Sequence, residues 1–234
     1  MKYNNVVEGI FINRENRFIC YCFVNGEKVK VYVPNTGRCK ELFIEGRKVY
    51  LTYHNDENRK TKYTLISIYK DDLLINIDSQ APNAVVEEAI LNKSILKDYN
   101  FTMVKREVKF DNSRFDFYLE GTYKDNNEFK GFLEVKGVTL EENGHATFPD
   151  APTLRGLKHL KELSLAVEKG YIAFVVFVIQ MSPMKDFVPN KSMQIDFSNE
   201  LKNAINNNVI CLCYECDVTK DSLSIKKEIP LGDF

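Results

Sequence analysis

Segments in which apolar and polar residues alternate fill the first third of the chain. A period of two is typical of strands that have one face in a core. An Asn-Gly pair at residues 25 and 26 separates two of these segments and predicts a tight hairpin. Short strands with little helix between them predict a small barrel of the oligonucleotide-binding (OB) type in residues 1–80. The expected strands cover residues 6–12, 17–24, 28–33, 48–54 and 61–69.

The pattern changes after residue 80, where helical and strand-like periods alternate. Pro82 and Asn83 open a segment with apolar residues at steps of three and four, which predicts a helix over residues 84–99. The mixed order of elements predicts an α/β domain over residues 81–234. Further helices are expected at residues 152–170 and 196–208, and strands at 103–110, 113–120, 131–140, 171–180 and 209–218.

Composition places the chain among ordinary globular proteins. Of its 234 residues, 44% are hydrophobic and 28% are charged, a balance that excludes an intrinsically disordered chain. The longest apolar run, at residues 171–179, is too short to span a bilayer, and no signal segment follows the first lysine. We therefore expect a cytoplasmic protein without a membrane partner. A net charge of -1 excludes a basic footprint over the whole protein, so any contact with nucleic acid must be local.

Two charged residues share one face of a strand-like segment in the predicted α/β domain. Glu134 and Lys136 are two positions apart, so a strand directs both to the same side. Leu133 and Val135 take the opposite side. Burying unpaired charge is costly, so charges inside an apolar strand indicate pairing or metal binding.

A carboxylate occupies the preceding strand-like segment. Asp116 stands between Phe115 and Phe117, so period-two geometry directs it away from both rings. If this segment pairs with the next one through the polar turn at residues 124–128, the carboxylates of Asp116 and Glu134 converge.

Two convergent carboxylates and a backbone carbonyl such as that of Val135 are hard oxygen ligands, which favour Mg²⁺ or Mn²⁺ over zinc. A metal held in this way can generate hydroxide near neutral pH and offset the charge that develops on a phosphate. We expect Asp116 and Glu134 to bind the metal and Lys136 to hold the attacking water and a phosphate oxygen.

A third carboxylate could complete the metal shell. Glu107, on the preceding strand, is the favoured candidate, and Glu87 or Glu88 on the first predicted helix are the alternatives. A structural ion pair between Glu134 and Lys136 explains the same pattern without any metal.

The helix predicted at residues 152–170 carries a candidate phosphate-binding surface. Thr153 suits its N-cap. Arg155 and His159 are one turn apart, with Lys158 beside them, so side chains and free backbone N–H groups can contact phosphate together. A solvated helix face is the alternative. Gln180, at the end of the following apolar strand, is a candidate hydrogen-bonding support for the site.

The predicted barrel combines cations with stackable rings, as surfaces that bind single strands do. Tyr32, Tyr53 and Tyr63 are the rings, although tyrosines in small barrels are also ordinary core or turn residues. The candidate nucleic-acid-binding residues of the whole chain are Asn35, Thr36, Arg38, Arg59, Lys60, Arg114, Arg155, Lys158 and His159.

Five separated blocks of sequence resemble one family, the sugar fermentation stimulation protein A family, over nearly the whole chain. The blocks are PNTGR at 34–38, RKTKY at 59–63, SRFDF at 113–117, EVKGVTL at 134–140 and FPDAPTLRGLKHLKEL at 148–163. The resemblance implies an OB barrel followed by a nuclease-like domain of the PD-(D/E)XK kind, and DNA as the partner.

The same resemblance assigns positions within the two predicted domains. Asp116, Glu134 and Lys136 match the nuclease core of the family. Asp150 matches the shared helix block, together with Arg155 and His159, and the family gives no settled role to that block.

The expected function is that of a DNA-binding protein with a Mg²⁺-dependent phosphodiesterase, or nuclease, site. The alternative is a non-catalytic DNA-binding regulator that keeps a nuclease-derived fold, since fold and function can separate. A third reading, an enzyme of sugar or nucleotide metabolism, lacks a Gly-rich phosphate-binding loop to support it.

Overall fold

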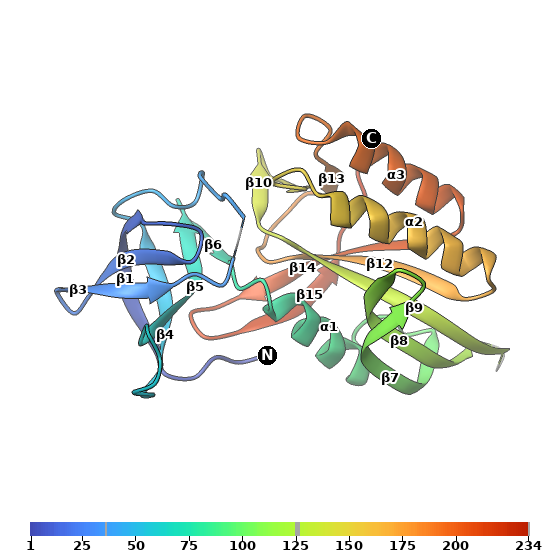
Figure 1. Cartoon of the computed structure of the whole chain (residues 1–234), viewed down its shortest axis with the longest axis horizontal. Helices are drawn as coiled ribbons and strands as arrows, with labels where there is room; N and C mark the ends of the chain where they lie inside the picture. Colours follow the sequence, from blue (N-terminus) through green and yellow to red (C-terminus); the bar gives the residue numbers. More distant parts are fainter. Residues whose placement is uncertain (36, 125–126, 234) are drawn as a thin grey trace.

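The computed structural model describes residues 1–35, 37–124 and 127–233 of the chain. Figure 1 shows a barrel of strands formed by the first third of the chain beside a larger sheet that helices cover on both faces. Among the described residues, no helix is long and apolar enough to cross a membrane.

The barrel is part of a six-stranded sheet, whose strands are antiparallel except where β3 pairs in parallel with β5. Its strand order is β3-β2-β1-β4-β5-β6, and an additional pairing of β3 with β5 closes a barrel of the first five strands. The prediction of an OB-like barrel is therefore confirmed. The strands are β1 (Val6–Arg14), β2 (Ile19–Val24), β3 (Glu27–Tyr32), β4 (Lys48–Tyr53), β5 (Tyr63–Lys70) and β6 (Leu73–Asn76).

Local sequence explains the barrel's first hairpin. Asn25 and Gly26 both have positive φ, of 50° and 84°, as the two central residues of a type I′ turn require. In β2, Cys20 and Cys22 are buried in the barrel core, while Phe23 points outward and is 46% exposed. The period of two in the sequence thus corresponds to the inner and outer faces of the barrel.

The α/β domain is built on a second six-stranded sheet with the order β15-β14-β12-β9-β8-β7. Its centre is parallel, because β12 pairs in parallel with both β9 and β14, and its edges are antiparallel. The strands are β7 (Tyr99–Phe110), β8 (Ser113–Tyr123), β9 (Asn127–Val138), β12 (Ile172–Ile179), β14 (Ile210–Val218) and β15 (Leu223–Glu228).

Helices cover both faces of this sheet. Helices α2 (Leu154–Glu168) and α3 (Ile195–Asn206) lie on one face, and α1 (Ala81–Leu91) lies on the other (Figure 1). Strand β12 is buried on both sides: Val175 and Phe177 pack in the core under α2 and α3, and Phe174 and Val176 pack in the core under α1. The prediction of a covered central strand is confirmed.

A small third sheet lies near the junction with the barrel (Figure 1). It consists of β10 (Leu140–Glu142), β11 (His145–Phe148) and β13 (Phe187–Pro189). The ammonium group of Lys70 on β5 binds the side chain of Glu141 on β10, and it donates to the Glu141 carbonyl at 2.8 Å. This contact ties the barrel to the α/β domain.

The first predicted helix is shorter than expected, and five short strands were not predicted. Helix α1 ends at Leu91, whereas the apolar spacing had extended it to Tyr99, which instead begins β7. Lys93 has a φ of 58°, which ends the helix, and Ile95 packs in the α1 core from irregular backbone. Ile95 thus fits the helical spacing of apolar residues although it lies beyond the end of the helix. The strands not predicted are β6, β10, β11, β13 and β15.

Candidate functional site

Asp116 lies where two neighbouring strands separate. The β8–β9 ladder runs from Tyr123 and Asn127 to Phe117 and Leu133 and includes no later pair. One residue further, Oδ2 of Asp116 accepts a hydrogen bond of 2.7 Å from the backbone N–H of Val135. The carboxylate of Asp116 therefore takes the hydrogen-bonding place of the partner strand. We call this place, where β8 and β9 separate after Phe117 and Leu133, the fork. The predicted pairing of the two strands is confirmed, although residues 125 and 126 of the connecting turn lie outside the described residues.

The predicted orientation of the rings beside Asp116 is wrong. Phe115 packs in the core under α2, where its ring contacts that of Phe132, whereas Phe117 packs in the core under α1. The strand therefore changes faces at Asp116. Across from it, Glu107 of β7 has a φ of 56° and lies between two paired positions without forming a pair itself. This local twist explains why strict alternation fails here.

The second oxygen of Asp116 binds a residue that the sequence did not single out as functional. Oδ1 accepts a hydrogen bond of 2.8 Å from Nδ2 of Asn83, in the first turn of α1. The only sequence signal was the position of Asn83 next to Pro82 at a helix start. Asn83 orients the carboxylate of Asp116 from the opposite face of the sheet.

Glu134 is the centre of the site, and its two oxygens differ. Oε1 accepts a hydrogen bond of 2.6 Å from Nζ of Lys136 and a second one from Nδ1 of His159. Oε2 is buried and has no hydrogen-bond partner among the residues that the structure describes. The residue as a whole is 3% exposed. Because an unpaired buried carboxylate oxygen is costly, Oε2 is suited to a cation.

The pKa values of the two carboxylates are shifted in opposite directions. Burial alone would raise the pKa of Glu134, but the charge of Lys136 and the hydrogen bond from His159 outweigh it and lower that pKa below its usual value. Burial and the negative charge of Glu134 raise the pKa of Asp116, against the opposing hydrogen bond from Val135. Such opposed shifts are typical of carboxylates in functional sites.

Helix α2 brings His159 to Glu134. The helix starts at a cap in which Oγ1 of Thr153 accepts from the N–H of Gly156 at 2.9 Å, as predicted for this residue. Nε of Arg155 donates to Nε2 of His159 at 3.4 Å, so the ring proton belongs on Nδ1, which faces Glu134. His159 is 3% exposed. It therefore does not lie on the exposed surface of α2 with Arg155 and Lys158.

The chemistry of the residues at the fork fits a hard divalent cation, although only two of its ligands would be carboxylate side chains. No group of three His, Cys, Asp or Glu side chains able to hold a metal occurs within residues 1–35, 37–124 and 127–233. Asp116 and Oε2 of Glu134 supply two carboxylates. N–H and C=O of one strand residue point to the same side, so the Val135 carbonyl faces the fork as well. Mg²⁺ accepts such a small protein contribution because it keeps several waters.

The other carboxylates considered for the metal shell are engaged elsewhere. The Glu107 side chain is 58% exposed and forms an ion pair of 3.9 Å with Arg114. Glu87 pairs with Arg106 at 2.6 Å, and Glu88 binds the amino group of Met1. The structure thus does not bring Glu107 together with Asp116 and Glu134.

A cleft of about 490 Å³ lies between the barrel and the α/β domain, beside the fork. Gly137, the neighbour of Lys136, lines it, and so does Thr153 at the start of α2. Residues that the sequence singled out in separate blocks meet here: Asn35, Arg38, Asp150 and Gln180. Thr36, another predicted contact, lies outside the described residues. Arg17 adds a cation that the sequence analysis had not selected.

Close packing joins the walls of this cleft. A Cβ atom on Gly37 would lie 2.4 Å from Oδ2 of Asp150 and 2.8 Å from Oδ1 of Asn35. Oδ1 of Asn35 accepts from the N–H of Gly37 at 2.7 Å. A side chain at position 37 would therefore force the Asp150 carboxylate and the Asn35 amide to move from these positions.

Gln180 holds the two parts of the chain together. It is 1% exposed, and its Nε2 donates to Oδ1 of Asn76 at 2.8 Å and to the carbonyl of Asp78 at 3.1 Å. Its partners are thus in the barrel and the linker rather than at the carboxylates of the fork.

The remaining predicted nucleic-acid contacts are exposed cations in two places. Arg59 and Lys60 lie in the loop before β5, where Nη2 of Arg59 donates to Oγ1 of Thr64 at 3.1 Å. Arg114 and Lys158 lie near the fork, and Nζ of Lys158 donates to the carbonyl of Asn112. These cations stay available to solvent and to phosphate groups.

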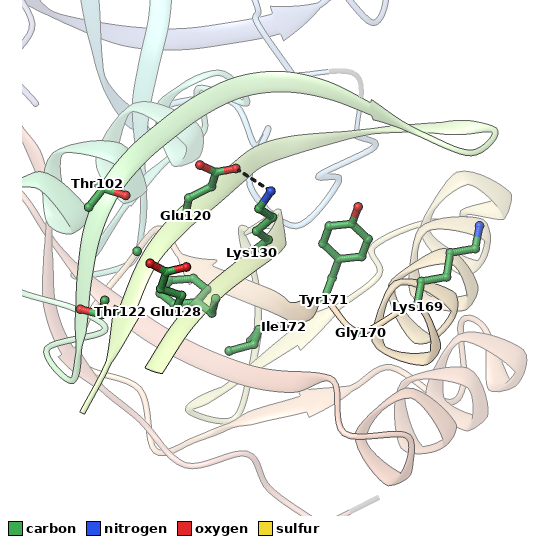
Figure 2. Close-up of a pocket in the computed structure, with 11 residues that line it drawn as sticks. Thr102, Glu120, Thr122, Glu128, Lys130, Lys169, Gly170, Tyr171 and Ile172 are labelled. Atoms are coloured by element: carbon green, nitrogen blue, oxygen red, sulfur yellow. Dashed lines mark ion pairs between the residues drawn. The ribbon is translucent and has the colours of Figure 1, made fainter. Parts of the chain in front are cut away.

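A different depression, of about 710 Å³, lies toward the hairpin end of β8 and β9 (Figure 2). Glu120 and Lys130 form an ion pair of 3.7 Å across it, with Tyr171 nearby (Figure 2). None of the predicted site residues lines this depression. Its carboxylates therefore provide controls for those of the fork.

Comparison with known proteins gives full-length matches. Residues 12–77 match the family model described as "SfsA N-terminal OB domain", and residues 80–222 match "Sugar fermentation stimulation protein RE domain". The chain is 50% identical to a sugar fermentation stimulation protein homolog of Clostridium novyi, with 99% of each chain covered. It is 49% identical to a homolog of Alkaliphilus oremlandii, with 100% of this chain and 97% of the relative covered.

Comparison with solved structures also gives a match over the whole fold. It is the SfsA protein of Pyrococcus furiosus in complex with Ca²⁺, with a TM-score of 0.85 and 25% sequence identity. The alignment covers 100% of this chain and 98% of the other.

Proposed function

The chain belongs to the sugar fermentation stimulation protein family, and we propose that it is a DNA-binding protein with a Mg²⁺-dependent phosphodiesterase site in its α/β domain. The observation that carries the proposal is the carboxylate of Glu134. One of its oxygens is fixed by Lys136 and His159, and the other is buried without a hydrogen-bond partner in the part of the chain that the structure describes. Asp116 beside it completes a D…E-x-K arrangement of the PD-(D/E)XK kind. The family name describes a phenotype and names no reaction.

The residues that would hold the metal are Asp116, Glu134 through Oε2, and the carbonyl of Val135. A bound Mg²⁺ or Mn²⁺ would supply hydroxide near neutral pH and stabilise charge on the phosphate. The Pyrococcus furiosus relative is described as a complex with Ca²⁺, a cation that also prefers oxygen ligands. That description supports a divalent cation as partner of this fold.

Lys136 acts on the substrate from the edge of the site. Its ammonium group has three N–H donors, of which one is used by Glu134. The other donors can bind a non-bridging phosphate oxygen and hold the attacking water. Positive charge at this place stabilises the negative charge that grows on the phosphate during attack.

Two residues position the carboxylates without touching the phosphate. His159 fixes Glu134 through Oε1, so that Oε2 stays directed away from Lys136. Asn83 fixes Asp116 through Oδ1. Partners of this kind orient metal ligands and set their basicity.

Exposed cations provide the affinity for the DNA backbone. Arg38 lines the interdomain cleft, and Arg155, Lys158 and Arg114 are exposed near the fork. The overall charge of -1 means that binding depends on these local groups. Binding is expected to weaken as salt rises, because each neutralised phosphate releases counterions.

A cleavage assay tests the proposal. Purified protein is incubated with labelled single- and double-stranded DNA and RNA in Mg²⁺ or Mn²⁺. Cleavage by the natural protein and its loss in Asp116→Ala and Glu134→Ala are expected. Glu120→Ala, which removes a carboxylate of the same strand in the depression of Figure 2, should cleave normally. Absence of cleavage, or equal cleavage by all variants, overturns the enzymatic function.

The second candidate function is DNA binding without catalysis. It is favoured by the hydrogen bonds that both oxygens of Asp116 and Oε1 of Glu134 already accept. These bonds can serve to fold the fork rather than to hold a metal. This candidate predicts salt-sensitive DNA affinity that needs no metal and survives alanine at Asp116 and Glu134.

A further inference from the structure

A groove of about 580 Å³ lies on the barrel beside the linker to the α/β domain. Three tyrosines line it: Tyr3 from the N-terminal segment, Tyr32 from the end of β3 and Tyr53 from the end of β4. His54 and Arg59 complete the wall on the side of β5. The groove therefore combines aromatic faces with hydrogen-bonding and cationic groups.

The charge of the groove favours an anionic ligand. Lys2 and Arg59 are its cations, and Asp78 is the one carboxylate among the described lining residues. Both oxygens of Asp78 are already engaged, Oδ2 by the hydroxyl of Tyr3 at 3.2 Å and Oδ1 by the N–H of Gln80 at 3.0 Å. The acidic group is thus used inside the protein, whereas Arg59 is exposed and keeps donors for a ligand.

His54 is a neutral hydrogen-bonding group that lies against strands β4 and β5. Its Nε2 lies 3.1 Å from the hydroxyl oxygens of both Thr52 and Thr64. Burial, and then the charge of Arg59, lower the pKa of His54 below its usual value. A neutral imidazole beside tyrosine rings suits the heteroatoms and flat face of a nucleobase.

The groove lies beside the start of the helix that contacts the candidate site. Its wall includes Gln80, the residue before α1, and Asn83 in the first turn of α1 donates to Asp116. It also adjoins the interdomain cleft, because Pro34 and Gln80 line the groove while Asn35 and Ser79 line the cleft. The N–H of Ser79 donates to the carbonyl of Pro34 at 3.2 Å, which fixes the linker between the two spaces.

We propose that this groove binds unpaired nucleotides of a single-stranded nucleic acid, stacks their bases on Tyr32 and Tyr53, and directs the strand over Gln80 to the carboxylate fork. Bases inside a duplex are stacked on each other and cannot lie against protein rings, so the groove selects single strands or frayed ends. The inference rests on the proposed function, because it assigns a substrate class to that site.

The test measures binding without cleavage. Affinities of the full chain for short labelled single strands of DNA and of RNA, and for the matching DNA duplex, are compared in EDTA by fluorescence anisotropy. Single strands are expected to bind more tightly than the duplex. Tyr53→Ala should weaken single-strand binding about fivefold or more, while Tyr53→Phe keeps the ring and the affinity. The two single strands distinguish DNA from RNA as the natural ligand.

Two further variants separate a binding role from a structural one. Arg59→Ala should reduce the slope of log affinity against log salt by about 0.7, the value for one phosphate of a single strand. Phe23→Ala, which removes an exposed ring from the outer face of β2, should bind like the natural protein. Thermal unfolding of each variant shows whether the fold is retained.

The outcomes are distinct from those of the cleavage assay. Equal affinity for single strand and duplex, or an unchanged affinity in Tyr53→Ala, overturns the inference even if metal-dependent cleavage is found. The expected losses in Tyr53→Ala and Arg59→Ala uphold the groove even if no cleavage occurs, and then the non-catalytic function is supported. Absence of binding to all three ligands overturns the groove inference and the non-catalytic DNA-binding function.

Discussion

His159 and Glu134 form a buried hydrogen bond that joins helix α2 to strand β9 at the fork. The imidazole occupies one carboxylate oxygen of Glu134, and the other oxygen has no hydrogen-bond partner among the described residues. A residue of helix α2 thus binds Oε1 of Glu134, while Oε2 is left for a ligand. The positions of His159 and Glu134, 25 residues apart in sequence, become coupled only through the fold.

Removal of this imidazole should reduce both stability and activity. His159→Ala leaves Oε1 of Glu134 with Lys136 alone in a buried place, so unfolding free energy in urea should fall by about 1–3 kcal/mol. Cleavage or Mn²⁺ affinity should fall about 10-fold to 100-fold, as for other residues that orient metal ligands. The control is His145→Ala, which removes a histidine paired with Asp186 away from the fork. Equal effects of the two variants contradict the positioning role.

The cap of α2 should contribute measurably to stability. Thr153→Ala removes the acceptor of the Gly156 N–H, and a loss of about 1 kcal/mol is expected in urea denaturation. Thr153→Ser keeps the hydroxyl and should stay close to the natural protein. If serine and alanine destabilise equally, the methyl contacts of Thr153 and not its hydroxyl explain the effect.

Contact between Gly37 and Asp150 can be tested by a double-mutant cycle. Gly37→Ala should destabilise the protein by about 1–3 kcal/mol, because its Cβ would overlap the Asp150 carboxylate. Asp150→Ala in the same chain removes that oxygen, so the double variant should recover part of the loss. Strictly additive effects, measured by urea denaturation, would show that the two residues do not meet in solution.

Protonation of His54 should make the barrel less stable in mild acid. Because burial and Arg59 lower its pKa in the folded state, the unfolded chain binds the proton more tightly. The stability is present above the unfolded pKa of about 6.5 and is lost as pH falls through the lower folded value. His54→Gln should therefore lose less stability than the natural protein when pH falls from about 7 to about 5. Parallel stability curves of the variant and the natural protein would contradict this.

Local patterns predicted the elements that depend on neighbouring residues. Period two placed Glu134 and Lys136 on one face of β9, and in the structure Lys136 binds Glu134 on the α2 side while Leu133 and Val135 pack on the α1 side. The hairpin turn at Asn25 and the cap at Thr153 were predicted for the same reason. In each case the deciding interactions lie within a few residues.

Long-range contacts decided the parts of the site that the pattern missed. Asn83 reaches Asp116 only because α1 packs across the fork. Strand β8 changes faces at Asp116, where it leaves β9 and where Glu107 of β7 has a positive φ. Glu107 was expected at the metal, but its exposed side chain pairs with Arg114. No spacing in the sequence encodes these relationships.

The sequence by itself determined which residues are candidates for the proposed chemistry: the carboxylates and lysine inside apolar strands, the cap of α2 and the loop around Asn35. Only the tertiary structure decided their arrangement. It buried His159 against Glu134, gathered Asn35, Arg38 and Asp150 in one cleft, and placed a tyrosine-lined groove beside α1. The physical reason is that side-chain identity and period are local properties, whereas burial and convergence depend on how distant strands and helices pack.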